Sequence, residues 1–226
     1  MWFSAKHPHN KILPEQLHWF AQLIQYLSLS ICYCLYKFQF DRIVIAGREK
    51  IPPKGTNYIA ASNHTSDLDP PVMSVALRFR PISYMAKQEL FDASFLGSLY
   101  YRSIGSFSVN REKLELATIK SSLTVLKHPG WILGIFPEGT RNREGKVGEA
   151  KRGVAYIAKT AKVGILPMAV MRIPARSGKA SQGKVKEDLC VQIGDFMPYD
   201  ETLSVEALMA IIQERLETLA EEAKTL

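Results

Sequence analysis

The sequence predicts an α/β fold, in which a mainly parallel, mixed sheet is flanked by helices and preceded by an N-terminal membrane-associating helix. Two patterns support this prediction. Short apolar runs of strand length alternate with helical patterns along most of the chain, and such alternation is typical of a parallel sheet covered on both faces. An amphipathic stretch comes before the first of these runs. The 226 residues suit one domain of this kind with an appended arm.

Residues 14–38 are predicted to form one amphipathic helix. Large apolar residues recur along it at helical spacing and share one face: Phe20, Leu23, Ile24, Leu27, Ile31, Cys34, Leu35 and Phe38. The opposite face carries glutamines and tyrosines, including Gln25 and Tyr36. This pattern favours a helix that lies in the membrane interface, and we expect residues 1–40 to be a membrane-associating arm and residues 41–226 the main domain. A spanning helix, which needs about 20 mostly apolar residues, and a core-packed helix stay open as alternatives.

The remaining elements follow in order along the chain. Apolar runs predict strands over residues 43–46, 58–62, 82–85, 107–109, 131–136, 165–170 and 189–193. Helices are expected to begin near Asp69, to cover residues 111–127 and 154–161, and to start again at Ser204. Residues 172–186 are rich in Lys, Arg, Ser and Gly, and they are interpreted as a basic surface loop.

Charge and cysteine content narrow the function classes. The chain carries 29 Lys and Arg against 22 Asp and Glu, which gives a formal net charge of +7 and favours anionic partners. It has no run of basic residues interleaved with aromatic ones, which argues against a binder of single-stranded nucleic acid. The three cysteines form no CxxC pair, so we expect neither a disulfide framework nor a zinc site.

His64 lies just past the end of a predicted strand, where α/β sheets place their ligands. Asp69 follows after four intervening residues and precedes two prolines, which suit the first turn of a helix. A carboxylate in this position can fix the tautomer of the imidazole and stabilise the imidazolium, while the other ring nitrogen takes a proton from a hydroxyl. The alternative is a loop histidine, with Asp67 or Asp69 as a plain helix cap.

Two further segments are candidates for anion binding. Arg111 ends the run Ile-Gly-Ser-Phe-Ser-Val-Asn-Arg, and its planar, permanently charged guanidinium suits a phosphate. Glu138, Gly139 and Thr140 form a turn directly after the strand 131–136, where backbone N–H groups can face an anion, and Arg141 adds positive charge. The alternative for Arg111 is a surface arginine near a helix start, where positive charge gains nothing from the helix dipole, which favours a functional role. The alternative for residues 138–141 is a turn with a solvated Glu and Arg, which is the default interpretation of that segment taken alone.

The ordered set of these motifs resembles the phospholipid/glycerol acyltransferase family. The set comprises His-x4-Asp at 64–69, Gly-x-Phe-x-Val-x-Arg at 105–111 and Phe-Pro-Glu-Gly-Thr-Arg at 136–141, with the apolar strand around Pro167 resembling a fourth motif. Within the family, the sequence is most similar to bacterial 1-acylglycerol-3-phosphate (lysophosphatidate) acyltransferases. The second motif departs from the family's usual pattern at Ser108 and Asn110.

The resemblance implies a reaction and roles for these residues. His64 would be the general base and Asp69 its orienting partner, while Arg111, Glu138, Gly139, Thr140 and Arg141 would hold the acceptor. It implies transfer of a fatty acyl group from acyl-CoA or acyl carrier protein to the free hydroxyl of lysophosphatidic acid, giving phosphatidic acid, without a metal or cofactor. The protein is then expected at a membrane surface, on the cytoplasmic face, with no nucleic-acid partner. Glycerol-3-phosphate or another lysophospholipid as acceptor, and a basic membrane-binding protein without catalysis, are the alternatives.

Overall fold

The computed structural model describes residues 11–12, 19–109, 115–142, 146–178, 180–181 and 184–226. The elements in chain order are α1 (Trp19–Gln39), β1 (Ile43–Ala46), the 3-10 turn η2 (Arg48–Lys50), β2 (Ile59–Ser62), α2 (Asp69–Ala76), β3 (Ile82–Lys87), α3 (Gln88–Asp92), α4 (Phe95–Ser103), β4 (Phe107–Val109), α5 (Leu116–Lys127), β5 (Ile132–Ile135), α6 (Gly153–Ala161), β6 (Ile165–Pro174), β7 (Ala180–Ser181), β8 (Lys184–Val185), β9 (Glu187–Ile193) and α7 (Val205–Thr225).

The sheet has the strand order β1-β9-β6-β2-β5-β3-β4. Among its described strands, every neighbouring pair is parallel except β6 and β9, which run antiparallel. The predicted α/β fold with a mainly parallel, mixed sheet is therefore confirmed. The antiparallel pair arises because β6 turns back into β9 through a hairpin, whereas parallel neighbours need a crossover connection.

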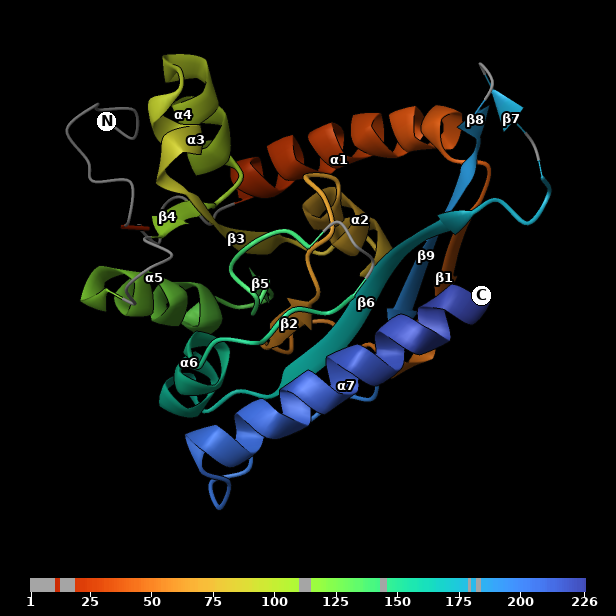
Figure 1. Cartoon of the computed structure of the whole chain (residues 1–226). Helices are drawn as coiled ribbons and strands as arrows, with labels where there is room; N and C mark the ends of the chain where they lie inside the picture. The colour runs from red at the N-terminus through yellow and green to blue at the C-terminus, as the bar shows by residue number, and fades with distance from the viewer. Residues whose placement is uncertain (1–10, 13–18, 110–114, 143–145, 179, 182–183) are drawn as a thin grey trace.

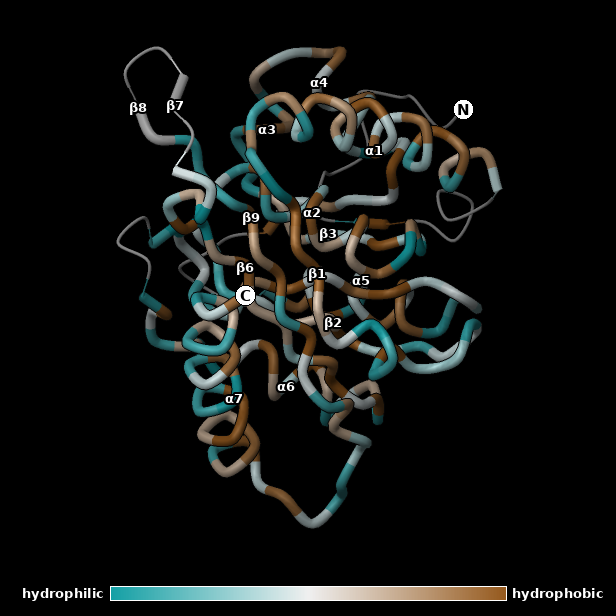
Figure 2. Tube along the Cα trace, turned by 90° about the vertical axis from the view of Figure 1, so that its right-hand side faces the viewer, coloured by the Kyte–Doolittle hydropathy of each residue, from teal (hydrophilic) through white to brown (hydrophobic). Residues whose placement is uncertain are grey.

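Helices cover both faces of this sheet, with α1 on one side and α7 on the other (Figure 1). Alternate residues of β2 point to opposite faces of the sheet. Ile59 and Ala61 belong to a core cluster with residues of α5, α6 and α7, whereas Ala60 and Tyr58, the residue before β2, belong to a cluster with residues of α1 and α2. Hydrophobic residues run through the central strands, as the brown segments of the trace show (Figure 2). Burial of both strand faces is what makes the predicted strands continuous apolar runs.

The helix α1 turns its large apolar residues away from the domain. Side chains on its inner face are buried against the rest of the molecule: Ala21, Gln25, Leu29 and Tyr36. Side chains on its outer face remain exposed: Leu23, Leu27, Ile31, Leu35 and Phe38, of which Phe38 is 81% exposed. None of the described helices combines the length and the apolar character that a bilayer crossing requires.

Several boundaries differ from the sequence-based prediction. The interpretation of residues 172–186 as a loop is wrong in two places. The strand β6 continues to Pro174, and residues 172–174 pair with residues 187–189 of β9. Within the same range, β7 and β8 pair as a short antiparallel sheet. The short helices α3 and α4 were not predicted, because their residues show no long apolar period. The first residues of the predicted helix 111–127, together with Asn110, lie outside the described residues, and α5 covers Leu116–Lys127.

Candidate active site

His64 and Asp69 form a buried pair at the end of β2. Asp69 is the first residue of α2, and its Oδ2 lies 2.9 Å from His64 Nδ1. Both residues are buried, with 6% of His64 and 1% of Asp69 exposed. The contact occupies Nδ1 of the imidazole, so the carboxylate fixes the ring orientation and leaves Nε2 to exchange a proton with a ligand.

The carboxylate of Asp69 is held by the loop that connects β2 to α2. Its Oδ2 accepts hydrogen bonds from the backbone N–H groups of Thr65, at 2.6 Å, and Ser66, at 2.8 Å. Its Oδ1 accepts from the hydroxyls of Thr65 and Ser66, each at 3.1 Å. A buried carboxylate with this many donors keeps a single position, and the N-terminus of α2 also favours its negative charge.

Asn63, the residue before His64, fixes the position of the chain next to His64. The Asn63 side-chain amide donates to the carbonyl of Val170 at 3.0 Å, and its oxygen accepts from the Val170 N–H at 2.8 Å. These two bonds continue the pairing of β2 with β6 one residue beyond the strand. Asn63 was not singled out from the sequence. An asparagine directly after an apolar strand could have indicated a side-chain hydrogen bond to the backbone of the neighbouring strand.

The ring of His64 stacks on Phe136, the residue that follows β5. The two ring centroids are 4.1 Å apart and the ring planes are inclined by 19°. Phe136 is in turn stacked with Tyr84 of β3, at 6.2 Å and 12°. The electron-rich face of a phenyl ring attracts a cation, so this arrangement supports an imidazolium at His64 as well as its orientation.

The turn after β5 brings the third motif to His64. Glu138 is 3% exposed, and its Oε1 accepts a hydrogen bond from the backbone N–H of His64 at 2.9 Å. Burial raises the pKa of the Glu138 carboxyl above its ordinary value, although the hydrogen bond from the His64 N–H and the nearby Gly148 N–H offset part of that effect. Gly139 has a φ of +67°, a left-handed conformation that glycine adopts without strain. Thr140 is exposed next to it.

Arg141 lies at the mouth of a cavity that reaches His64. The guanidinium Nη1 donates to Asp67 Oδ2 at 2.6 Å, and both residues line the cavity together with His64. The cavity has a volume of about 430 Å³. Apolar side chains form a large part of its wall and come from α1, β3 and α3, from the residue after α4 and from the segment after β5: Leu29, Met85, Leu90, Ile104 and Phe136. A charged mouth with an apolar interior suits an amphiphilic ligand.

Two of the polar side chains that line this cavity, Tyr84 and Gln25, are held by hydrogen bonds. The Tyr84 hydroxyl donates to the carbonyl of Pro70 at 2.7 Å and lies 3.0 Å from the hydroxyl of Ser74. Burial raises the pKa of Tyr84 far above its ordinary value, so the hydroxyl keeps its proton near neutral pH. The Gln25 side chain bonds to the N–H and the carbonyl of Ile82, which fastens α1 to β3. These bonds fix the positions of Tyr84 and Gln25 in the cavity wall, and Lys87 adds a positive charge to the lining.

The structure brings together most of the residues that the sequence singled out. His64, Asp69, Glu138 and Arg141 meet at the C-terminal ends of β2 and β5, which are neighbours in the sheet. Arg111 lies outside the described residues. Within the described part of the chain, no group of three or more His, Cys, Asp or Glu side chains is arranged to hold a metal ion.

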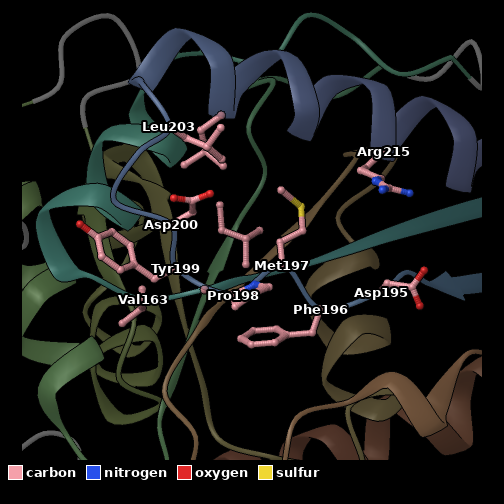
Figure 3. Close-up of a pocket in the computed structure, with 12 residues that line it drawn as sticks. Val163, Asp195, Phe196, Met197, Pro198, Tyr199, Asp200, Leu203 and Arg215 are labelled. Atoms are coloured by element: carbon pink, nitrogen blue, oxygen red, sulfur yellow. The ribbon is translucent and has the colours of Figure 1, made fainter.

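A second cavity, of about 320 Å³, lies under α7 at the other end of the sheet (Figure 3). It is lined by Ile165 at the start of β6 and by Phe196, Met197 and Tyr199 in the segment before α7. Arg215 from α7 stands at its edge. Because β6 runs parallel to β2 and Ile165 pairs with Ile59, this cavity is separated from His64 by the length of the strands.

Comparison with known proteins identifies clear similarities. A family model described as Acyltransferase matches residues 42–171. The chain is 32% identical over 178 residues to a 1-acyl-sn-glycerol-3-phosphate acyltransferase of Streptococcus pneumoniae, covering 78% of this chain and 65% of that protein. It is 34% identical over 134 residues to the protein of the same name from Bacillus subtilis, covering 59% of this chain and 65% of the relative. The chain thus spans slightly less than two thirds of the length of these relatives.

Among solved structures, the fold is similar to that of a 1-acyl-sn-glycerophosphate (LPA) acyltransferase, PlsC, from Thermotoga maritima. The TM-score is 0.69 at 22% sequence identity, and the match covers 91% of this chain and 80% of that one. At this level of identity the similarity supports the arrangement of strands and helices described above.

Proposed function

This chain belongs to the Acyltransferase family, and we propose that it transfers a fatty acyl group from a thioester to the free sn-2 hydroxyl of 1-acylglycerol-3-phosphate, giving phosphatidic acid. The observation that carries the proposal is the contact of 2.9 Å between His64 Nδ1 and Asp69 Oδ2, at the inner end of a cavity with Arg141 at its mouth. The names of the relatives from Streptococcus pneumoniae and Bacillus subtilis support the choice of acceptor.

In the proposed reaction His64 acts as the general base. Its Nε2 takes the proton from the acceptor hydroxyl as that oxygen attacks the carbonyl carbon of the thioester. The tetrahedral intermediate collapses with cleavage of the C–S bond, and the proton passes from His64 to the departing thiolate. Asp69 stabilises the imidazolium that exists between these two steps, and general-base help of this kind contributes about 10²–10⁴ in rate. No acyl-enzyme intermediate is required.

The acceptor phosphate is proposed to bind at the mouth of the cavity. Arg141 already pairs with a carboxylate there, and its fork can form two charge-assisted hydrogen bonds with a phosphate. Gly139 and Thr140 in the same turn, and Arg111, complete the proposed anion site. Glycerol-3-phosphate, and lysophospholipids other than lysophosphatidic acid, also carry a phosphate. These residues would therefore recognise the phosphorylated class of acceptor and not its acyl chain.

The apolar interior is proposed to receive an acyl chain. A chain that enters past Phe136 would meet Leu29, Met85 and Leu90, whose side chains form an apolar wall. Burying each methylene of such a chain contributes about 0.8 kcal/mol, which favours a long-chain ligand over a short one.

The outer face of α1 is proposed to lie on the membrane that supplies the acceptor. Exposed apolar side chains of α4, next to α1, extend the same surface: Phe95, Leu96 and Tyr100. Residues 1–40 would act as the membrane-associating arm, on the cytoplasmic face where thioester donors are available. An apolar helix face with a tyrosine-rich flank suits the interface between headgroups and acyl chains.

An acyl-transfer assay tests this function directly. Purified protein is offered acyl-CoA or acyl carrier protein as donor, crossed with lysophosphatidic acid, glycerol-3-phosphate and lysophospholipids with larger headgroups. We expect transfer to lysophosphatidic acid to exceed transfer to the other acceptors. Arg141→Ala and Arg111→Ala should each raise the KM for the phosphorylated acceptor more than the KM for the donor. A protein that binds vesicles and transfers no acyl group to any acceptor would contradict the proposal.

A further inference from the structure

Both backbone polar groups of His64 are bonded to the turn that follows β5. The His64 N–H donates to Glu138 Oε1 at 2.9 Å, and the His64 carbonyl accepts from the Asn142 N–H at 2.8 Å. Because His64 is buried, neither group can exchange its partner for water at no cost. The conformation of residue 64 therefore depends on the position of the segment 138–142.

Glu138 faces His64 and not the cavity. Its side chain is buried, and the cavity wall includes its neighbours Phe136 and Arg141 but not Glu138 itself. A carboxylate that binds an acceptor hydroxyl needs an oxygen open to the cavity. In the described structure one carboxylate oxygen of Glu138 is bonded to the His64 backbone, and the other faces Gly148.

Gly148 packs against the carboxyl of Glu138 on the side away from His64. A Cβ atom at position 148 would lie 2.6 Å from Glu138 Oε2 and 3.3 Å from Glu138 Cδ, so any larger residue would push the carboxyl out of place. The segment around Gly148 is itself fastened to α7. Gln213 accepts from the Ala150 N–H at 2.8 Å and donates to the Gly148 carbonyl at 3.3 Å.

We propose that Glu138 is a positioning residue for the general base, which it holds through the backbone N–H of His64, and that Gly148 keeps the Glu138 carboxyl in place. This inference rests on the proposed function, because it gives His64 the role of base. It replaces the substrate-binding role that the sequence pattern suggested for Glu138. Glu138 and Gly148 then connect the catalytic loop to α7.

The test separates turnover from acceptor binding in Glu138→Ala, Glu138→Gln and Gly148→Ala. Glu138→Ala removes the oxygen that accepts the hydrogen bond from the His64 N–H, so the base is expected to move. Because a shift of about 1 Å costs about 10²-fold in rate, we expect kcat to fall by that amount, with the KM for lysophosphatidic acid little changed. Glu138→Gln retains an oxygen for this bond and should recover at least about tenfold of that loss. Gly148→Ala should lower kcat in the same way, although it changes no residue of the cavity wall.

Gly153→Ala is the matched control for Gly148→Ala. A Cβ atom at position 153 meets nothing within 4 Å, so this variant makes the same chemical change in open space, and its kcat and KM should equal those of the unchanged protein. Equal kinetics for Gly148→Ala and Gly153→Ala would overturn the role of Gly148. A raised KM for the acceptor with retained kcat in Glu138→Ala would show that Glu138 binds substrate, and the proposal would fail.

Amide hydrogen exchange at His64 supplies a readout that does not depend on activity. Exchange of the His64 N–H should be faster in Gly148→Ala and in Glu138→Ala than in the unchanged protein, and close to normal in Glu138→Gln. If Glu138→Ala does not fold, the other two variants carry the test. Unchanged exchange in Gly148→Ala together with unchanged kcat would overturn the inference. Acyl transfer by His64→Ala at the normal rate would instead overturn the proposed function, whatever the exchange rates.

Discussion

Asp67 and Arg141 form an ion pair at the mouth of the cavity, with 2.6 Å between Asp67 Oδ2 and Arg141 Nη1. Asp67 is 75% exposed at its side chain, and Arg141 is 27% exposed. The two residues are 74 positions apart in the sequence. The pair places a carboxylate on the guanidinium that we propose to bind the acceptor phosphate, so Asp67 and the phosphate compete for the same donor groups.

Asp67→Asn should therefore strengthen acceptor binding. We expect the KM for lysophosphatidic acid to fall by up to about fivefold, since an exposed ion pair of this kind contributes about 0.2–1 kcal/mol, while kcat stays close to normal. The effect should shrink as salt is added. Kinetics at low and at moderate ionic strength measure it, and a large fall in kcat would assign Asp67 to the chemistry instead.

Removal of the base should abolish most of the turnover. His64→Ala is expected to lower kcat by about 10²–10⁴ in a folded protein, because the other described groups bonded to the Asp69 carboxylate are backbone N–H groups and hydroxyls, which are poor bases. Asp69→Asn keeps the size of the side chain but removes the charge that stabilises the imidazolium, so its loss should also be large. The double variant should be little worse than either single one, since the two residues act as a unit. Additive losses would contradict the pairing.

Phe136 should contribute to turnover through its stacking on His64. Phe136→Leu keeps an apolar side chain but removes the aromatic face at 4.1 Å, and we expect kcat to fall by about tenfold, the equivalent of about 1.4 kcal/mol of cation–π stabilisation and orientation. Phe136→Tyr retains the ring and should keep most of the turnover. Circular dichroism and melting temperatures of both variants check that the fold is retained. Equal kcat in the two variants would show that the ring acts only by filling space.

The outer face of α1 should bind membranes. Ile31 and Leu35 are 63% and 60% exposed, so changing both to Glu should leave the fold intact while reducing binding to phospholipid vesicles by tenfold or more, at about 1.5–3 kcal/mol for each buried apolar side chain. Leu116→Glu is the matched control, because Leu116 is 69% exposed on α5, on the other face of the sheet. Vesicle sedimentation compares the variants, and equal binding by both would place the membrane contact elsewhere.

Glu138 should make the stability of the fold depend on pH. Its pKa is raised in the folded protein by burial, so the unfolded chain releases this proton at a lower pH than the folded chain does. Stability is then lost as pH rises from about 4.3, the ordinary glutamate value, through the raised value of the folded state. The melting temperature of Glu138→Gln minus that of the unchanged protein should increase over this window. A difference that is constant with pH would show that the folded and unfolded pKa values are equal.

Local patterns were sufficient for most elements of the fold, although not for α3, α4, β7 and β8. The strand Ile43–Ala46 was predicted at its observed bounds, and Ser204 caps α7 by accepting from the Ala207 N–H, as expected for a serine at a helix start. The pairing of His64 with Asp69 was also predictable from the sequence, because His64 lies on the short loop after β2 and Asp69 begins the helix to which that loop leads. Contacts of this kind depend only on nearby residues.

Tertiary structure alone decided how distant segments meet at the site. The order of strands places β5 beside β2, and this brings Phe136 onto the ring of His64 and the Glu138 carboxyl onto its backbone. Strand order depends on which apolar surfaces pack together, and the hydrophobic period of one strand does not encode its neighbours. The sequence therefore determined the chemical groups, the α/β fold class and the amphipathic face of α1. The three-dimensional packing decided that Asp67 contacts Arg141, that Glu138 faces His64, and that the apolar face of α1 is turned outward.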